Sequence, residues 1–179
     1  PYASAIAVTT REERQLGVTA IDIGGGVTTV AMFAEGHFLH TDAVAVGGHH
    51  LTIDIARALS APLAESERIK ALYGTMVVAR SDSHEPITYP RTGDDEETLY
   101  STTKAQLREV MRPRMASLFA LLRERIERSP VSGLATRHIV LSGGGSQLVG
   151  LGEFAANVLG HPVRVARPLP VAGLPSGLS

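Results

Sequence analysis

The sequence predicts an α/β domain built on a mixed β-sheet, with a smaller α/β unit inserted into it. Two observations predict the sheet. Glycine turns join β-rich runs over 18–46, and an apolar strand, a glycine loop and a helix follow over 138–159. The insertion is predicted because residues 75–128 combine short β-like pieces, a polar loop and one long helix. With 179 residues, 44% hydrophobic but only 4% aromatic, the chain can bury a largely aliphatic core.

The first half of the chain predicts three strands followed by two helices. The strands are expected at 18–21, 28–33 and 37–46, and the helices at 49–60 and 62–74. A tight turn at Glu35-Gly36 joins the second and third strands. Apolar residues at four-residue spacing indicate the first helix, and Pro62 and Gly74 bracket the second. Residues 11–14 are interpreted as a solvated loop.

The second half predicts the insertion and the return to the sheet. Thr103 and Gln106 form a capping-box pattern at the start of the longest helix, expected over 103–128 with a kink at Pro113. The other elements expected are β-like pieces at 75–79 and 86–89, an acidic loop at 94–97, a strand at 138–141, a helix at 147–159 and a last strand at 162–165.

Composition excludes several classes of function. The 17 Lys and Arg balance 18 Asp and Glu, so nothing indicates nucleic acid as a partner. The absence of cysteine excludes disulfides, thiolate zinc sites and a cysteine nucleophile, and fits a cytoplasmic protein. No apolar stretch approaches the roughly 20 residues that span a bilayer. The chain starts at Pro1 and stops in what looks like an unfinished loop, so we expect a fragment.

The first motif whose residues could bind a ligand is Asp22-Ile23-Gly24-Gly25-Gly26-Val27-Thr28-Thr29. A strand ends in a carboxylate, and glycines turn the chain into the next strand, which lets backbone N–H groups approach an anion. Asp22 is a candidate for holding Mg²⁺ through water, and Thr28 for bonding a phosphate oxygen. A plain hairpin whose Asp satisfies turn amides fits the motif as well. It is neither a dinucleotide fingerprint nor a Walker loop.

The second motif is Ser142-Gly143-Gly144-Gly145-Ser146-Gln147, between an apolar strand and a helix. Amides at a helix N-terminus favour electronegative groups, and glycines leave a flat wall that suits a nucleoside. An ordinary strand-to-helix turn is the alternative. No histidine stands at a spacing that would pair with Ser142 or Ser146, which argues against a hydrolase triad.

The order of the two loops, about 120 residues apart, resembles the phosphate-2 and adenosine motifs of the actin, sugar-kinase and heat-shock-chaperone ATPase superfamily. Glu67 and Lys70, one helical turn apart, fit this resemblance. A Glu/Lys pair with this spacing flanks the adenosine in the chaperone branch and in the bacterial cell-division family FtsA. An exposed salt bridge three residues apart is the other interpretation of the pair.

The resemblance to FtsA runs through nearly the whole chain. It rests on Pro1 to Ser4, Glu13 to Val18, Asp54 to Ala56, Ile69-Lys70 with Gly74, Leu107 to Arg114 and Ile139 to Leu151. It implies an actin-like ATPase lobe, with a ribonuclease-H-like mixed sheet flanked by helices. Residues 1–74 and 129–179 would form subdomain 2A, and 75–128 the inserted subdomain 2B.

The resemblance also implies the ligand and its contacts. ATP with Mg²⁺ would be the cofactor, and Asp22 would hold the metal indirectly, through water. The phosphate-binding residues would be Asp22, Gly24, Gly25, Gly26 and Thr28. The adenosine-binding residues would be Glu67, Lys70, Gly143, Gly144, Gly145 and Ser146. The other phosphate clamp would belong to a first lobe, so we expect weak or no ATP binding by this chain alone.

The family further implies partners and a location. FtsA proteins form actin-like filaments at the inner face of the plasma membrane at the division site, where they tether the tubulin-like protein FtsZ. A C-terminal helix beyond Ser179 would supply the membrane anchor. The FtsZ C-terminal tail would dock on subdomain 2B through Arg114, the basic residue after a proline. One turn later the family commonly has Glu where this chain has Ser117, which leaves the docking contacts open.

Charge on the long helix is consistent with docking of an acidic peptide. Residues 104–128 hold seven basic and three acidic side chains, a local net charge of +4. A solvated helix face explains the same excess. The alternatives are a pilus-assembly scaffold like PilM, which shares the core with the rod-shape protein MreB, or a kinase of the same superfamily acting on a small metabolite. We expect at most a slow ATPase, not a metabolic enzyme.

Overall fold

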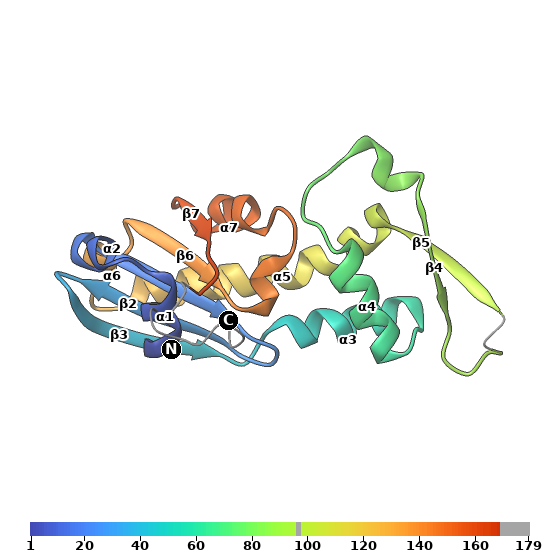
Figure 1. Ribbon diagram of the computed structural model, residues 1–179, viewed down its shortest axis with the longest axis horizontal. Helices are drawn as coiled ribbons and strands as arrows, with labels where there is room; N and C mark the ends of the chain where they lie inside the picture. The colour runs from blue at the N-terminus through green and yellow to red at the C-terminus, as the bar shows by residue number, and fades with distance from the viewer. Residues whose placement is uncertain (96–97, 169–179) are drawn as a thin grey trace, which may run out of the picture.

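The computed structural model describes residues 1–95 and 98–168, and a five-stranded mixed sheet forms its centre (Figure 1). Part of the expected acidic loop, at 96–97, lies outside the described residues. The strand order is β3 (His37–Val44), β2 (Thr28–Ala34), β1 (Val18–Ile23), β6 (His138–Ser142) and β7 (Val163–Val165). The strand β2 runs antiparallel to both of its neighbours, β3 and β1, whereas β6 is parallel to β1 and to β7. The mixed sheet predicted from the sequence is confirmed.

A two-residue turn closes the hairpin between β2 and β3, as the sequence predicted. Glu35 and Gly36 both have positive φ angles, 53° and 78°. Hairpins favour turns with two positive φ angles because their twist matches that of the strands. Glycine adopts such an angle without strain, so Gly36 is suited to the second turn position.

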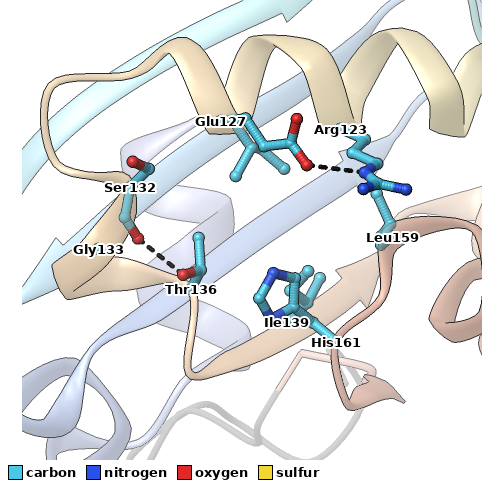
Figure 2. A pocket seen from close by; sticks show the side chains of 9 residues that line it. Arg123, Glu127, Ser132, Gly133, Thr136, Ile139, Leu159 and His161 are labelled. Atoms are coloured by element: carbon cyan, nitrogen blue, oxygen red, sulfur yellow. Dashed lines mark hydrogen bonds and ion pairs between the residues drawn. The ribbon is translucent and has the colours of Figure 1, made fainter.

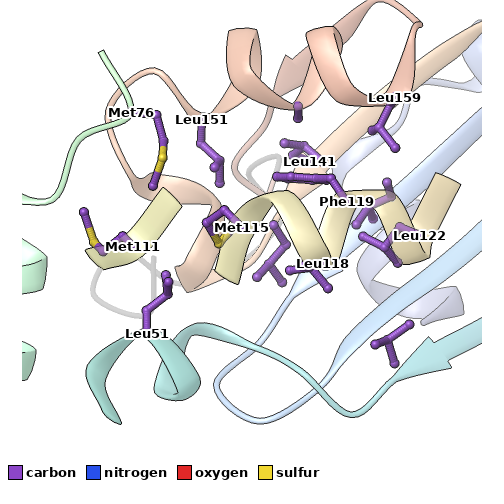
Figure 3. Close-up of a cluster of buried hydrophobic side chains, with 14 of the residues drawn as sticks. Leu51, Met76, Met111, Met115, Leu118, Phe119, Leu122, Leu141, Leu151 and Leu159 are labelled. Carbon is purple, nitrogen blue, oxygen red and sulfur yellow. The ribbon is translucent and has the colours of Figure 1, made fainter. Parts of the chain in front are cut away.

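Alternate residues of β1 face two different layers. Ile21 and Ile23 pack into the larger core with α5 (Lys104–Arg128) and α7 (Leu151–Leu159), while Val18 and Ala20 pack with α1 (Tyr2–Val8) on the other face. Figure 3 shows how the larger core is filled by the apolar face of α5. This two-sided burial fixes the register of β1, because a shift by one residue would exchange the layers.

Beyond the sheet, a second group of elements packs around the first half of α5 (Figure 1). It contains α3 (Gly48–Leu59), α4 (Leu63–Tyr73), the 3₁₀ turn Arg80–Ser83 and the hairpin of β4 (Pro86–Pro90) and β5 (Leu99–Thr103). The helix α5 continues through Pro113 into the sheet core, where the Phe119 and Phe154 ring centroids lie 6.3 Å apart. It therefore connects the two groups, and the division of the chain at 75 and 128 stays a prediction.

Three local expectations differ from the structure, and some of its elements were not expected. The expected loop at 11–14 is the helix α2 (Arg11–Leu16), whose N-terminus is capped by a capping box of Thr10 and Glu13. The expected strand at 75–79 is wrong, since only Thr75 makes a β-bridge, to Val149. The strand β5 and the helix α1 were not expected. The glycine loop first forms a 3₁₀ turn, so α7 begins at Leu151 and not at 147.

The helix α2 is held by tertiary contacts that its composition does not reveal. Glu13 accepts two hydrogen bonds from Arg164, both at 2.8 Å, and Arg164 also donates to the carbonyl of Val8. Although partial burial opposes it, the hydrogen bond from Arg164 lowers the pKa of Glu13. A short helix of this kind is marginal by itself, and these contacts stabilise it.

Candidate functional site

The turn after β1 is held against the start of α3 by backbone hydrogen bonds. Gly24 N–H donates to Val27 O at 3.0 Å, which closes the turn. The N–H groups of Gly48 and His49 donate to the carbonyls of Gly24 and Gly25, at 2.9 and 2.8 Å. The first amides of α3 are therefore used by the turn. A side chain at Gly47 would overlap the same carbonyls, so glycine is required there.

The other side of this turn is open. Gly25 and Gly26 are exposed, and a Cβ added at either would meet nothing within 4 Å. Within the part of the chain that the structure describes, no backbone acceptor pairs with their N–H groups. Because the carbonyls point toward α3, these amides are free to meet an anion.

Two predicted phosphate-site residues differ in accessibility. Asp22 is half-buried at the end of β1 and lines a cavity. Thr28 is fully buried, and its hydroxyl donates to the Val46 carbonyl at 2.7 Å. The geometry therefore favours a structural role for the Thr28 hydroxyl, while Asp22 is available to a ligand.

The glycine loop after β6 lies directly on the end of β1. Gly143 has a φ of 84°, and a side chain there would overlap Asp22 Oδ1 and the Ile23 carbonyl. A side chain at Gly145 would overlap that of Ile23, whereas one at Gly144 would meet nothing within 4 Å. The two motifs that are about 120 residues apart in the sequence are thus in contact, and Gly144 is the open position between them.

Glu67 and Lys70 form part of a network that links α4 to α3. Lys70 Nζ lies 2.7 Å from Glu67 Oε2 and also donates to the Gly48 carbonyl at 3.0 Å and to Thr52 Oγ1 at 2.8 Å. Thr52 in turn donates to Glu67. The Lys70 side chain is only 13% exposed, so this is more than a surface ion pair.

The same network affects the ionisation of Glu67. Partial burial would raise its pKa, but the hydrogen bonds from Lys70 and Thr52 outweigh this and lower it. The carboxylate, 54% exposed, is therefore kept ionised and accessible beside the largely buried Lys70 side chain.

These side chains and the glycine loop surround one pocket of about 200 Å³. Of the predicted adenosine-binding residues, Glu67, Lys70, Gly144 and Gly145 line it, while Gly143 and Ser146 do not. Ser146 is buried, and its hydroxyl donates to the Gly143 carbonyl at 2.7 Å.

Several lining residues were missed in the sequence. They are Gly48, Leu51, Ala71, Leu72, Gly74, Gln147, Leu148 and Val149. Two of them, Gly48 and Gly74, are glycines at helix ends, and this is a signal that the sequence contains. Gly48 is the first residue of α3, and Gly74 follows the last residue of α4. A side chain at Gly74 would overlap the Lys70 carbonyl.

A second cavity, of about 560 Å³, lies across the glycine loop from the first. Asp22, Ser142, Gly143 and Gly144 form one wall, and Ser4 of α1 contributes to another. It opens beyond the carboxyl ends of the parallel strands β1 and β6, which is where open α/β sheets bind their ligands. Gly144 lines both cavities, so a single extended ligand can contact the two.

The pocket in Figure 2 is separate from this site. It has a volume of about 230 Å³ and lies where β6 begins, near Ile139, whereas the glycine loop follows where β6 ends. The Arg123–Glu127 ion pair and the hydrogen bond from Thr136 to the Ser132 carbonyl line it. None of the predicted site residues contributes to this pocket.

The predicted docking residue Arg114 is already paired. Its Nε and Nη2 atoms donate to Asp54 Oδ2 and Oδ1 at 2.7 and 2.8 Å. This bidentate hydrogen bonding raises the Arg114 pKa. Arg114 remains 35% exposed, and Ser117, one turn further along α5, is exposed.

Ion pairs also neutralise most of the basic charge on α5. The partners of Lys104, Arg108, Arg114, Arg123, Arg125 and Arg128 are Glu85, Asp82, Asp54, Glu127, Asp42 and Glu124 respectively. Arg112 is exposed, and among the described residues it has no such partner. The local charge of +4 thus overstates the positive surface, because four of the six acidic partners lie outside α5.

The fold is that of one lobe of an actin-like protein. The structure is similar to MreB5 of Spiroplasma citri bound to ADP, with a TM-score of 0.78 at 21% identity over 92% of this chain and 53% of the other. It is also similar to the PilM-PilN type IV pilus biogenesis complex, with a TM-score of 0.66 at 22% identity over 88% of this chain and 38% of the other. At these identities the likeness shows the fold alone.

Sequence comparison shows the family. A sequence model described as "Cell division protein FtsA" matches residues 19–176, and the chain belongs to the FtsA family. It is 42% identical over 98% of its length to Cell division protein FtsA of Agrobacterium fabrum and 33% identical over 96% to that of Escherichia coli K12. The chain spans only about two fifths of these relatives, 40% and 42% of their lengths. Of residues 1–95 and 98–168, no helix is both long and apolar enough to cross a membrane.

Proposed function

We propose that this chain forms the second-lobe wall of an ATP and Mg²⁺ site in an actin-like cell-division protein. The observation that carries the proposal is the pocket of about 200 Å³ where Glu67 and Lys70 meet Gly144 and Gly145. The residues that line it come from three separate parts of the chain, 48–51, 67–74 and 144–149, and none of these parts belongs to the sheet. The flat glycine surface suits an adenosine. The Glu67 carboxylate is able to accept hydrogen bonds from the ribose hydroxyl groups of that adenosine.

The phosphate groups would lie against the turn after β1. The open amides of Gly25 and Gly26 favour an anion, and no side chain blocks their approach. Asp22 lines the neighbouring cavity with a carboxylate, the type of ligand that hydrated Mg²⁺ prefers. When bound, Mg²⁺ would neutralise phosphate charge. The opposing phosphate contacts would come from the first lobe.

Family membership supports this function over the two alternatives. The pilus-scaffold alternative shares the fold, but its similarity stays at 22% identity, below the 33% to 43% found for FtsA relatives. A kinase for a small metabolite needs a base that faces its substrate, which in this superfamily the first lobe would normally contribute, so the family match alone argues against this alternative.

We propose further that Arg114 and Ser117 mark the docking site of the FtsZ C-terminal tail. Arg114 is partly exposed and presents a planar guanidinium group suited to a carboxylate of that tail. The full protein would self-associate into actin-like filaments at the inner face of the membrane, anchored by a C-terminal helix. These roles follow from the family.

The nucleotide site is tested by substitution within α4. A chimaera in which this chain replaces the matching segment of the Agrobacterium fabrum relative supplies the remaining lobe. Lys70→Met should weaken binding of a fluorescent ATP analogue at least tenfold, because it removes the group that orders Glu67 and Gly48. Arg68→Met is the matched control, since Arg68 forms an ion pair with Glu65 and does not line the pocket. Equal affinities of the two variants would refute the site.

The 179-residue chain alone provides a second test of the same proposal. Without the opposing lobe it should bind ATP weakly or not at all in isothermal titration. Sub-micromolar affinity of the isolated chain would overturn the two-lobe description of the site.

The docking proposal is tested with a labelled FtsZ C-terminal tail peptide followed by fluorescence anisotropy. Saturable micromolar binding should weaken at least tenfold in Arg114→Ala and less than twofold in Arg112→Ala, the neighbouring exposed arginine. Circular dichroism controls for folding. If Arg114→Ala leaves the affinity unchanged, FtsZ remains the partner but its tail docks elsewhere on the chain. If a folded chain does not bind the peptide, the pilus-scaffold alternative is favoured.

A further inference from the structure

Ser142 holds a buried hydroxyl that the fold leaves unsatisfied. It is the last residue of β6 and is 3% exposed. Among the described residues, its Oγ is the buried side-chain polar atom for which no hydrogen-bond partner is found. Such atoms are rare in native proteins, because the lost hydration is not replaced. The exception therefore requires a reason.

The position of this hydroxyl supplies the reason. Ser142 is directly opposite Asp22 in the register of the parallel pair β1–β6. Residues opposite each other on adjacent strands extend to the same face of the sheet. Both residues line the cavity of about 560 Å³ beyond the ends of these strands. A hydroxyl and a carboxylate thus stand side by side at the mouth of one cavity.

A second serine in the same loop shows what a structural hydroxyl looks like. Ser146 is equally buried, at 1% exposure, but its hydroxyl donates to the Gly143 carbonyl at 2.7 Å and accepts from Gln147 Nε2 at 3.1 Å. Ser146 thus stabilises the loop by bonding to two other residues of the same loop. Ser142 makes no such bond, although it is only four residues away.

We propose that Ser142 is a positioning residue of the Asp22 subsite, where its hydroxyl orients a water of the hydrated divalent cation that accompanies a nucleoside phosphate. This inference rests on the proposed ATP site. A serine hydroxyl donates one hydrogen bond and accepts two, whereas an ionised carboxylate only accepts. Ser142 is therefore able to accept from a water O–H group, as Asp22 is, and also to donate a hydrogen bond into the cavity, which Asp22 cannot do.

The test compares Ser142→Ala with Ser142→Thr and with Ser146→Ala as the matched control. Without nucleotide, Ser142→Ala should raise the melting temperature of the 179-residue chain by roughly 2–4 °C, since an unpaired buried hydroxyl is removed. Ser146→Ala should lower it, because two hydrogen bonds are lost. A merely structural serine at 142 would behave like Ser146.

Nucleotide affinity gives the second readout, measured on the chimaera with a fluorescent ATP analogue in MgCl₂ and in EDTA. Ser142→Ala should lose about tenfold in affinity in MgCl₂ and less than twofold in EDTA, and Ser142→Thr should retain the magnesium-dependent affinity. Equal losses with and without Mg²⁺, no loss, or a lowered melting temperature of Ser142→Ala would overturn the role of Ser142. Failure of the unsubstituted chimaera to bind nucleotide would instead refute the proposed ATP site, and this inference with it.

Discussion

The nucleotide-facing wall and the outer surface of α5 are built by different means. In the wall, backbone groups of two glycine loops meet each other and the start of α3, and one side-chain network, of Lys70, Glu67 and Thr52, joins α4 to them. On α5, six basic side chains are held by carboxylates, four of which come from other elements. The first region depends on shape at the backbone, and the second on long-range side-chain pairs. Substitutions should therefore act differently in the two regions.

The largest expected effect is a difference in the free energy of unfolding between alanine substitutions at two adjacent glycines of the wall. Gly143→Ala should destabilise the chain by roughly 2–4 kcal/mol, because a Cβ there overlaps Asp22 and Ile23 and the φ of 84° strains any L-residue. Gly144→Ala should stabilise it slightly, by about 0.5 kcal/mol, since its surroundings are open and alanine restricts the unfolded chain. Urea unfolding measures both. Similar free energies of unfolding for the two variants would show that the loop is not held by close packing.

The wall was also the region that the sequence predicted best. Asp22, Gly143 and the strands that carry them were assigned from local patterns, because glycine runs and apolar alternation act over a few residues. The structure places both loops in contact, which the local patterns alone do not show. What the local pattern could not show was which atoms are already used, as for Thr28, or left unused, as for Ser142.

The α5 surface was predicted less well for a physical reason. Counting charges along the helix gave +4, but the partners Asp42 and Asp54 are distant in the sequence and adjacent only in the fold. The helix α2 was missed although Thr10 and Glu13 form a capping box, because six residues are too few for an apolar period to be visible. Tertiary contacts decided both cases.

A smaller effect is expected from the Arg114–Asp54 pair of α5 and α3. A double-mutant cycle of Arg114→Ala and Asp54→Ala should give a coupling free energy of about 0.5–1 kcal/mol, since Arg114 is 35% and Asp54 19% exposed and solvent screens the pair. The coupling should decrease at high salt. Thermal or urea unfolding of the four proteins measures it. A coupling near zero would mean that Arg114 is free in solution and available to an acidic peptide without displacement of Asp54.

The smallest expected effect is the pH dependence contributed by Glu67, which tests how much its charge adds to the stability of the wall. Its pKa lies below the ordinary value of 4.5 in the folded chain, because hydrogen bonds from Lys70 and Thr52 outweigh partial burial. A lowered pKa means that the unfolded chain binds the proton first as the pH falls. The stabilisation is therefore fully present above about pH 5 and is lost as the pH falls through the lowered pKa.

Because the Glu67 side chain is 54% exposed, its contribution should be only a few tenths of a kcal/mol. Wild type should be more stable than Glu67→Gln near pH 6, and the difference should shrink toward pH 3.5, as measured by urea unfolding at both values. Glu65→Gln, on the same helix but outside the pocket, should show the same trend, since the hydrogen bond from Arg68 also lowers the pKa of Glu65. A difference that is constant with pH would show that Glu67 stabilises the wall by packing and not by charge, which would make the wall dependent on shape alone.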